Sequence, residues 1–228
     1  APYFLPGMTD SHIHIESTML TPVNFSKIAV AHGVVNSVSD PHEITNVLGV
    51  EGIDFMVDNA KSTRFNCYFG LPSCVPSSHL ETAGAVIDAA MTAELIKRDD
   101  LWYLAEMMNY PGIINDDPEV VGKVKAALSV GKVVDGHAPG VLGEDLVKYL
   151  GAGITTDHEC STMQEANERI ALGAKIIVRE GSAARNFEAL SDVLAQHPEV
   201  AMLCSDDKHP DDLIEGCLLY TSDAADDL

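Results

Sequence analysis

The segment MTDSHIHI (residues 8–15) decides the fold, because it is strand-like and the helical segment PVNFSKIAVAHG (residues 22–33) follows it. In a β-strand, residues two apart point to the same face, so His12 and His14 are expected to point the same way. Two imidazoles on one face can share one metal ion. Two solvated histidines at an exposed strand end are the alternative interpretation, and the pair alone does not decide between them.

The same strand and helix unit recurs along the chain. Further strands are predicted at residues 34–40, 66–74, 101–109, 132–140, 154–160, 175–182 and 200–207. Helical segments between them open at Ile44 or cover residues 91–99, 118–131, 143–153, 162–174 and 184–197, and glycines that follow four of the helices are expected to cap them. Eight strands with helical crossovers predict an α/β fold, a (β/α)8 barrel of the TIM type.

The end of the chain departs from this pattern. Few residues follow the eighth strand, so we expect the barrel to be incomplete at its eighth helix. Residues 1–216 are predicted to be a partial catalytic barrel. Residues 217–228 are short, acidic and unlike the preceding sequence, and we expect them to lie outside the fold.

Composition excludes several classes of protein. A formal net charge of −21 over 228 residues disfavours nucleic acids and anionic membranes as partners and favours cations. No apolar run is long enough to span a bilayer, and the first residues do not resemble a signal peptide. The five cysteines are odd in number and scattered, so we expect no disulfide framework and a soluble, cytoplasmic protein.

Ligand-type residues gather at the ends of the predicted strands, where barrels of this type place their chemistry. Histidines and carboxylates stand there at His12, His14, Asp40, His42, Glu43, Glu106, Asp135, His137, Asp157, His158, Glu159, Asp206 and Asp207. Four histidines from three strands, with carboxylates from others, predict one or two divalent ions with open coordination positions. Taken alone, His137 could simply cap a loop, and His158 could be a buried histidine that forms a hydrogen bond with a backbone carbonyl. Glu106 has apolar neighbours, and an unpaired carboxylate there would cost several kcal/mol, which favours a cation partner.

Other catalytic motifs are absent from the sequence. HIE at residues 14–16 lacks the P-C-x-x-C of cytidine-type zinc deaminases, and HEITN at residues 42–46 is not H-E-x-x-H. No phosphate-binding loop, nucleophile elbow or dinucleotide fingerprint is present.

The opening PGMTDSHIHIES resembles the P-G-x-x-D-x-H-x-H start of the amidohydrolase superfamily. With SDPHEITNVLG, LAEMMNYPGII, VDGHAPG, TTDHE and MLCSDDKHPDDL, roughly residues 1 to 215 resemble bacterial-type adenine deaminases. This resemblance implies a catalytic barrel accompanied by a smaller β domain built from both chain ends. It also implies two divalent ions, with manganese or iron favoured and zinc as the alternative. Its ligands would be His12 and His14 for one ion, His137 and His158 for the second, Glu106 as the bridge and Asp206 as the strand-eight carboxylate.

The reaction implied by the resemblance is hydrolytic deamination of adenine to hypoxanthine and ammonia by a metal-activated hydroxide. Asp206 would accept the proton of the hydroxide, and Glu159, Glu43 and His42 are the candidates for protonating the purine ring. Met108 and Tyr110 are candidates for lining a flat purine pocket, with barrel packing as the alternative, and Asp207 is a further candidate for substrate contact. Adenine is the expected partner, and a homodimer is the assembly considered for the full-length enzyme.

Two other functions stay open at this point. The same hydroxide could act on a cyclic amide or an N-acyl substrate, because the pocket and not the fold selects the substrate. The chain could also be an inactive metal-binding fragment, since the eighth helix is not visible in the sequence.

Overall fold

Eight parallel strands run through residues 6–215, the part of the chain that the computed structural model describes. They are β1 (Met8–Ile13), β2 (Val34–Ser39), β3 (Asn66–Phe69), β4 (Leu104–Met107), β5 (Val134–Gly136), β6 (Thr156–Asp157), β7 (Lys175–Arg179) and β8 (Ala201–Cys204). Each lies inside a predicted strand segment, so the predicted number and order of strands are confirmed. The observed strands are shorter than the predicted segments, mostly at their carboxyl ends, where residues such as His14, Asp40 and Asp206 follow the strands.

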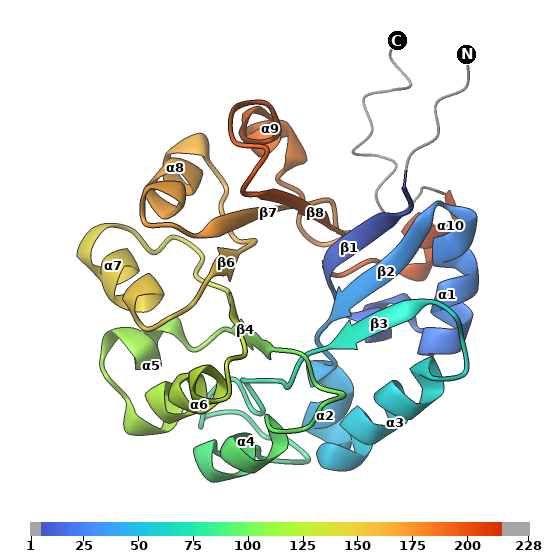
Figure 1. The fold of residues 1–228 in the computed structure, drawn as a ribbon, viewed down its shortest axis with the longest axis horizontal. Coiled ribbons are helices and arrows are strands. Elements are labelled where there is room, and N and C mark those ends of the chain that lie inside the picture. Colours follow the sequence, from blue (N-terminus) through green and yellow to red (C-terminus); the bar gives the residue numbers. More distant parts are fainter. Residues whose placement is uncertain (1–5, 216–228) are drawn as a thin grey trace.

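Helices separate the strands and lie outside them in Figure 1. They are α1 (Pro22–Ala31), α2 (His42–Leu48), α3 (Val50–Ala60), α4 (Ala89–Leu95), α5 (Tyr110–Ile114), α6 (Pro118–Ser129), α7 (Gly143–Gly151), α8 (Met163–Ala171), α9 (Phe187–Gln196) and α10 (Pro210–Glu215), with a 3-10 turn, η1 (Ile15–Thr18), after β1. Helix α2 begins two residues before the predicted Ile44. The predicted glycine caps are confirmed, since the glycines after α1, α6, α7 and α8 have positive φ: Gly33, Gly131, Gly153 and Gly173.

The strands form three parallel sheets, in the orders β1-β2-β3, β4-β5 and β6-β7-β8. Isolated parallel bridges join neighbouring sheets, at Leu71 with Leu104, at Val134 with Ile154, and at Ile13 with Asp206. The α/β class with parallel strands is therefore confirmed, although the strands are divided into three sheets. At the last bridge, Asp206 N–H donates to the His12 carbonyl at 2.9 Å, which holds the end of β8 beside the end of β1.

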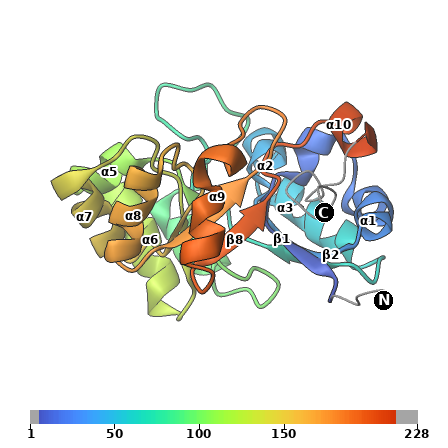
Figure 2. The same ribbon diagram turned by 90° about the horizontal axis from the view of Figure 1, so that it is seen from above.

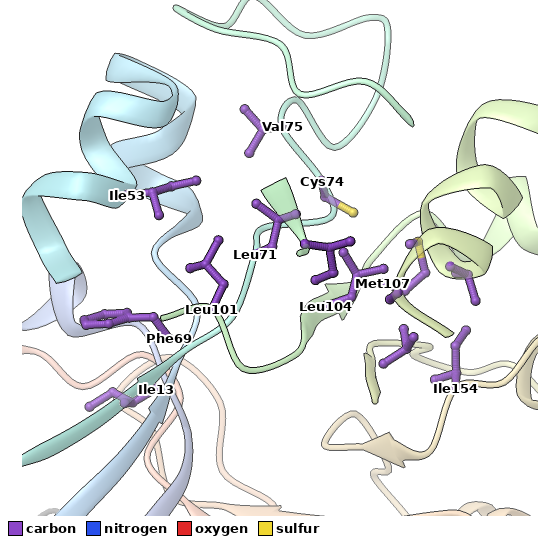
Figure 3. Close-up of a cluster of buried hydrophobic side chains, with 14 of the residues drawn as sticks. Ile13, Ile53, Phe69, Leu71, Cys74, Val75, Leu101, Leu104, Met107 and Ile154 are labelled. Carbon is purple, nitrogen blue, oxygen red and sulfur yellow. The ribbon is translucent and has the colours of Figure 1, made fainter. Parts of the chain in front are cut away.

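The apolar core lies between the strands and the helices. Ile13, Ile53, Phe69, Leu101 and Leu104 belong to one continuous buried cluster, which Figure 3 shows in close-up. Burial of such side chains contributes roughly 1.5–3 kcal/mol each. Ile13 separates His12 from His14 in the sequence and is fully buried in this core, so its packing fixes the orientation of the strand that carries both histidines.

The last described element, α10, packs through the fully buried Leu213 and contacts η1. The predicted tail, residues 217–228, lies outside the described residues, as does Cys217. Within residues 6–215, no helix is long and apolar enough to cross a membrane. Figure 2 shows the segment between β3 and α4 reaching beyond the helices on the side toward which β8 points.

The cysteines yield a prediction on thiol chemistry. Cys67, Cys74, Cys160 and Cys204 are free, and burial raises the pKa of Cys67 to about 11 and that of Cys160 to about 12. Since the thiolate is the reactive form, we expect these thiols to react slowly with a disulfide reagent at pH 8 in the folded protein. Denatured, unreduced protein should then titrate all five thiols of the sequence. A titration that finds three would show a disulfide and contradict the prediction.

Candidate metal centre

The end of β1 presents two imidazoles to one side, as the sequence predicts, with His12 in the strand and His14 directly after it. The Nδ1 atom of His12 donates to Asp135 Oδ2 at 2.8 Å, and that of His14 donates to the carbonyl of Asp40 at 3.0 Å. Because these acceptors take the Nδ1 protons, the Nε2 atoms are the ring nitrogens directed into the site to bind a metal ion, and they lie 3.2 Å apart. This is the arrangement of two imidazole ligands that are held for one metal ion.

A second pair, His137 and His158, follows β5 and β6. These strands approach so closely at Gly136 that a Cβ there would lie 2.2 Å from the carbonyl oxygen of Thr156, which explains the glycine in VDGH. The two ring centroids are 5.4 Å apart, and His158 also stacks on His12 at 4.1 Å. The four imidazoles, His12, His14, His137 and His158, therefore form one cluster, called the imidazole cluster below.

Glu106, at the end of β4, lies between the two pairs and is 3% exposed. Its Oε1 is 3.2 Å from His14 Nε2, while its Oε2 is 2.8 Å from His137 Nδ1 and 3.3 Å from His158 Nε2. Burial opposes the charge, but the hydrogen bonds from the histidines hold the pKa of Glu106 well below its usual range. The carboxylate is therefore ionised, with one oxygen directed to each histidine pair.

Asp206, which follows β8, completes the first pair. Its Oδ1 lies 3.3 Å from His14 Nε2 and 3.7 Å from His12 Nε2. The residue has a φ of 52°, in the left-handed region that Asp and Asn tolerate best among residues with a side chain. Asp207 points elsewhere, since its Oδ1 accepts from Ser17 Oγ at 2.5 Å. The structure thus brings Asp206, and not Asp207, to the imidazole cluster.

Strand β7 contributes Arg179, a residue that the sequence analysis missed. Its Nη1 donates to Asp206 Oδ2 at 2.6 Å and to Glu159 Oε1 at 2.7 Å, and its Nη2 donates to Glu159 Oε2 at 2.8 Å. The guanidinium therefore holds the carboxylates that follow β6 and β8 in fixed positions. The signal was available, because Arg179 follows the apolar run IIV as a polar residue at a strand end.

Two of the remaining candidates, His42 and Glu43, lie at the border of the cluster. His42 Nδ1 is 3.0 Å from Asp40 Oδ2 and 3.5 Å from Glu106 Oε1, and Glu43 is 3.7 Å from His14 Nδ1. Met108 and Tyr110 are half-buried and pack against the hydrophobic core. Among these four residues of the described part of the chain, His42 and Glu43 are the ones that contact the cluster and Glu106.

The charges of the cluster fit a divalent cation. Burial disfavours a charged His12, yet the hydrogen bond and charge of Asp135 raise its pKa to about 9. A positive charge on His12 thus balances the Asp135 carboxylate, and a bound metal ion replaces protons on its ligands. His158 Nδ1 is buried and has no hydrogen-bond partner among the residues that the structure describes. Groups of three or four of these side chains place ligand atoms within 4.8 Å of one another, including His12 with His14 and Asp206, and Glu106 with His137 and His158.

Comparison with known proteins identifies the family. The model of the amidohydrolase family matches residues 3–212. The chain belongs to the amidohydrolase family. Membership of this family implies divalent metal ions, in agreement with the donor set of the cluster.

Curated relatives narrow the comparison within the family. An adenine deaminase of Methanosarcina mazei is 55% identical over 212 residues, which are 93% of this chain and 38% of the relative. An adenine deaminase of Parabacteroides distasonis is 52% identical over 214 residues, 94% of this chain and 39% of the relative. The chain thus spans about two fifths of the length of the curated relatives that it matches.

Solved structures agree on the fold. N-isopropylammelide isopropylaminohydrolase from Burkholderia multivorans superposes with a TM-score of 0.55 at 15% identity, covering 90% of this chain and 63% of that one. A beta-aspartyl dipeptidase from Fervidobacterium islandicum gives a TM-score of 0.54 at 14% identity, covering 89% and 59% of the two chains. At this identity the likeness concerns the fold alone.

Proposed function

We propose that this chain carries the catalytic centre of an adenine deaminase, which hydrolyses adenine to hypoxanthine and ammonia. The observation that carries the proposal is its identity of 50–55% to adenine deaminases over more than nine tenths of its length. The cluster supports it, because two histidine pairs around one carboxylate suit the activation of water for hydrolysis. Residues 1–216 would form the catalytic part as a (β/α)8 barrel, in which isolated bridges join the three sheets.

Two metal ions would be held in this centre. His12, His14, Asp206 and Glu106 Oε1 would bind one, and His137, His158 and Glu106 Oε2 the other, with Glu106 as the bridge. The resemblance to adenine deaminases favours manganese or iron, with zinc as the alternative, and imidazole and carboxylate ligands suit all three. When bound, the ions lower the pKa of a water molecule and supply a hydroxide at neutral pH.

The protein side chains would move the protons. Asp206 Oδ2 is held by Arg179, which leaves Oδ1 directed at the cluster to accept the proton of the water and pass it to the departing ammonia. Glu159, on the same guanidinium, lies 3.3 Å from His137 Nδ1 and is our candidate for the hydrogen bond to the purine ring, ahead of Glu43 and His42. A single guanidinium would then set the distance between the proton acceptor and the group that polarises the ring.

The substrate is tested by a paired assay. Manganese-loaded protein should release ammonia from adenine and produce hypoxanthine, and it should not open the ring of a dihydropyrimidine. Ring opening without adenine turnover would favour a cyclic-amide hydrolase. An increase of the melting temperature with added manganese but no turnover of either substrate would instead favour the inactive metal-binding fragment.

A further inference from the structure

We infer that Arg169, on α8, is a positioning residue for the second histidine pair. It holds the two loops that carry His137 and His158 at the distance needed to bind one ion. Arg169 is fully buried, although it is charged. Burial of a charge is costly unless every donor finds a partner, so its contacts are informative.

The guanidinium contacts three separate parts of the chain. Nε donates to Asp157 Oδ2 at 2.8 Å, Nη2 donates to the carbonyl of Ala138 at 2.6 Å, and Nη1 donates to the carbonyl of Glu165 at 3.3 Å. The last contact lies within α8 itself. The first two reach the residue before His158 and the residue after His137.

Asp157 extends the connection toward the site. Its second oxygen, Oδ1, accepts from the backbone N–H of Glu159 at 2.8 Å, so the carboxylate spans His158 from both sides. Asp157 is also fully buried. Arg169 thus fixes the backbone around His158 through Asp157 and the backbone beside His137 through Ala138, without contacting the imidazoles. We call this arrangement the α8 clamp (Arg169, Asp157 and the Ala138 carbonyl).

A buried ion pair could instead only stabilise α8. The two roles differ in what they predict for metal binding. If the α8 clamp positions His137 and His158, its loss weakens binding of the ion at these two histidines. The ion at His12 and His14 is spared, because Asp135 and the Asp40 carbonyl hold those two imidazoles. Groups that orient metal ligands typically change metal affinity by about 10- to 100-fold.

The test is titration of the metal-free full chain with Mn²⁺ alone, followed by equilibrium dialysis and metal analysis. Arg169→Met should lower the affinity of one of two sites by about 10- to 100-fold and leave the other unchanged. Arg169→Lys should recover part of the loss, because an ammonium can still reach one of the two loops. The double variant Asp157→Asn with Arg169→Met removes both buried charges and keeps an acceptor for Glu159 N–H. If Arg169→Met alone does not fold, this double variant tests the positioning role instead.

Lys132→Met is the matched control. Lys132 Nζ donates to three backbone carbonyls, those of Ile96, Arg98 and Leu101, away from the imidazole cluster. It should lower the melting temperature and leave both affinities unchanged. Equal affinities in wild type and the double variant, or equal weakening of both ions, would overturn the positioning role. This inference rests on the proposed metal centre, and wild-type protein that fails to bind two ions would remove that centre and the clamp's role together.

Discussion

Asp206→Asn is expected to lower kcat for adenine by about 100- to 10,000-fold while the metal ions stay bound, because general acid-base groups contribute a factor of that order. Asparagine keeps a carbonyl oxygen as a ligand and loses the basic carboxylate. The backbone also accepts the change, since Asp206 has a φ of 52° and asparagine tolerates this region. Metal binding and proton transfer should therefore separate in this variant.

The control is Asp207→Asn, measured for kcat and metal content beside Asp206→Asn. Asp207 bonds to Ser17 and lies away from the imidazole cluster, so its replacement should have the smaller effect on kcat. If Asp207→Asn abolishes turnover and Asp206→Asn does not, the roles of the two aspartates are exchanged.

Glu106→Gln should reduce the metal content from two ions per chain to one. Glutamine offers one carbonyl oxygen, whereas Glu106 directs a separate oxygen to each histidine pair, so one ion loses its ligand. We expect the affinity for that ion to fall by roughly 100-fold or more. Loss of a direct ligand should weaken binding more than loss of a residue that only orients a ligand, which typically costs about 10- to 100-fold. Deaminase activity should fall with it.

Glu94→Gln is the matched substitution on the surface. Glu94 lies on α4 at an exposed position, and within residues 6–215 its ion pair is with Lys97, three residues away. It should leave both metal content and turnover unchanged. Full occupancy of two ions in Glu106→Gln would contradict the bridge.

The strand order and the gathering of the main candidate ligands at strand ends could be predicted because they depend on local patterns. The HIHI alternation places His12 and His14 on one face, and polar residues after apolar runs mark the ends of β4 and β8. The supporting contacts could not be predicted in this way. The partner of His12, Asp135, is 123 residues away in the sequence, and only the folded chain shows which nitrogen of the ring it binds.

The division of the strands into three sheets also depends on packing that the sequence does not reveal. Strand β6 consists of two residues, and it meets β5 where Gly136 allows the backbones to approach. Arg169 is a further example, since a charged residue in a predicted helix is normally solvated, and only the contacts with Asp157 and Ala138 explain its burial.

The most direct test of the account is a crystal structure of the manganese-loaded protein with anomalous scattering data collected near the manganese edge. We predict two anomalous peaks, one among His12, His14 and Asp206 and one between His137 and His158, with Glu106 in contact with both. A single peak, or two peaks that Glu106 does not connect, would contradict the bridged centre on which the proposed function depends.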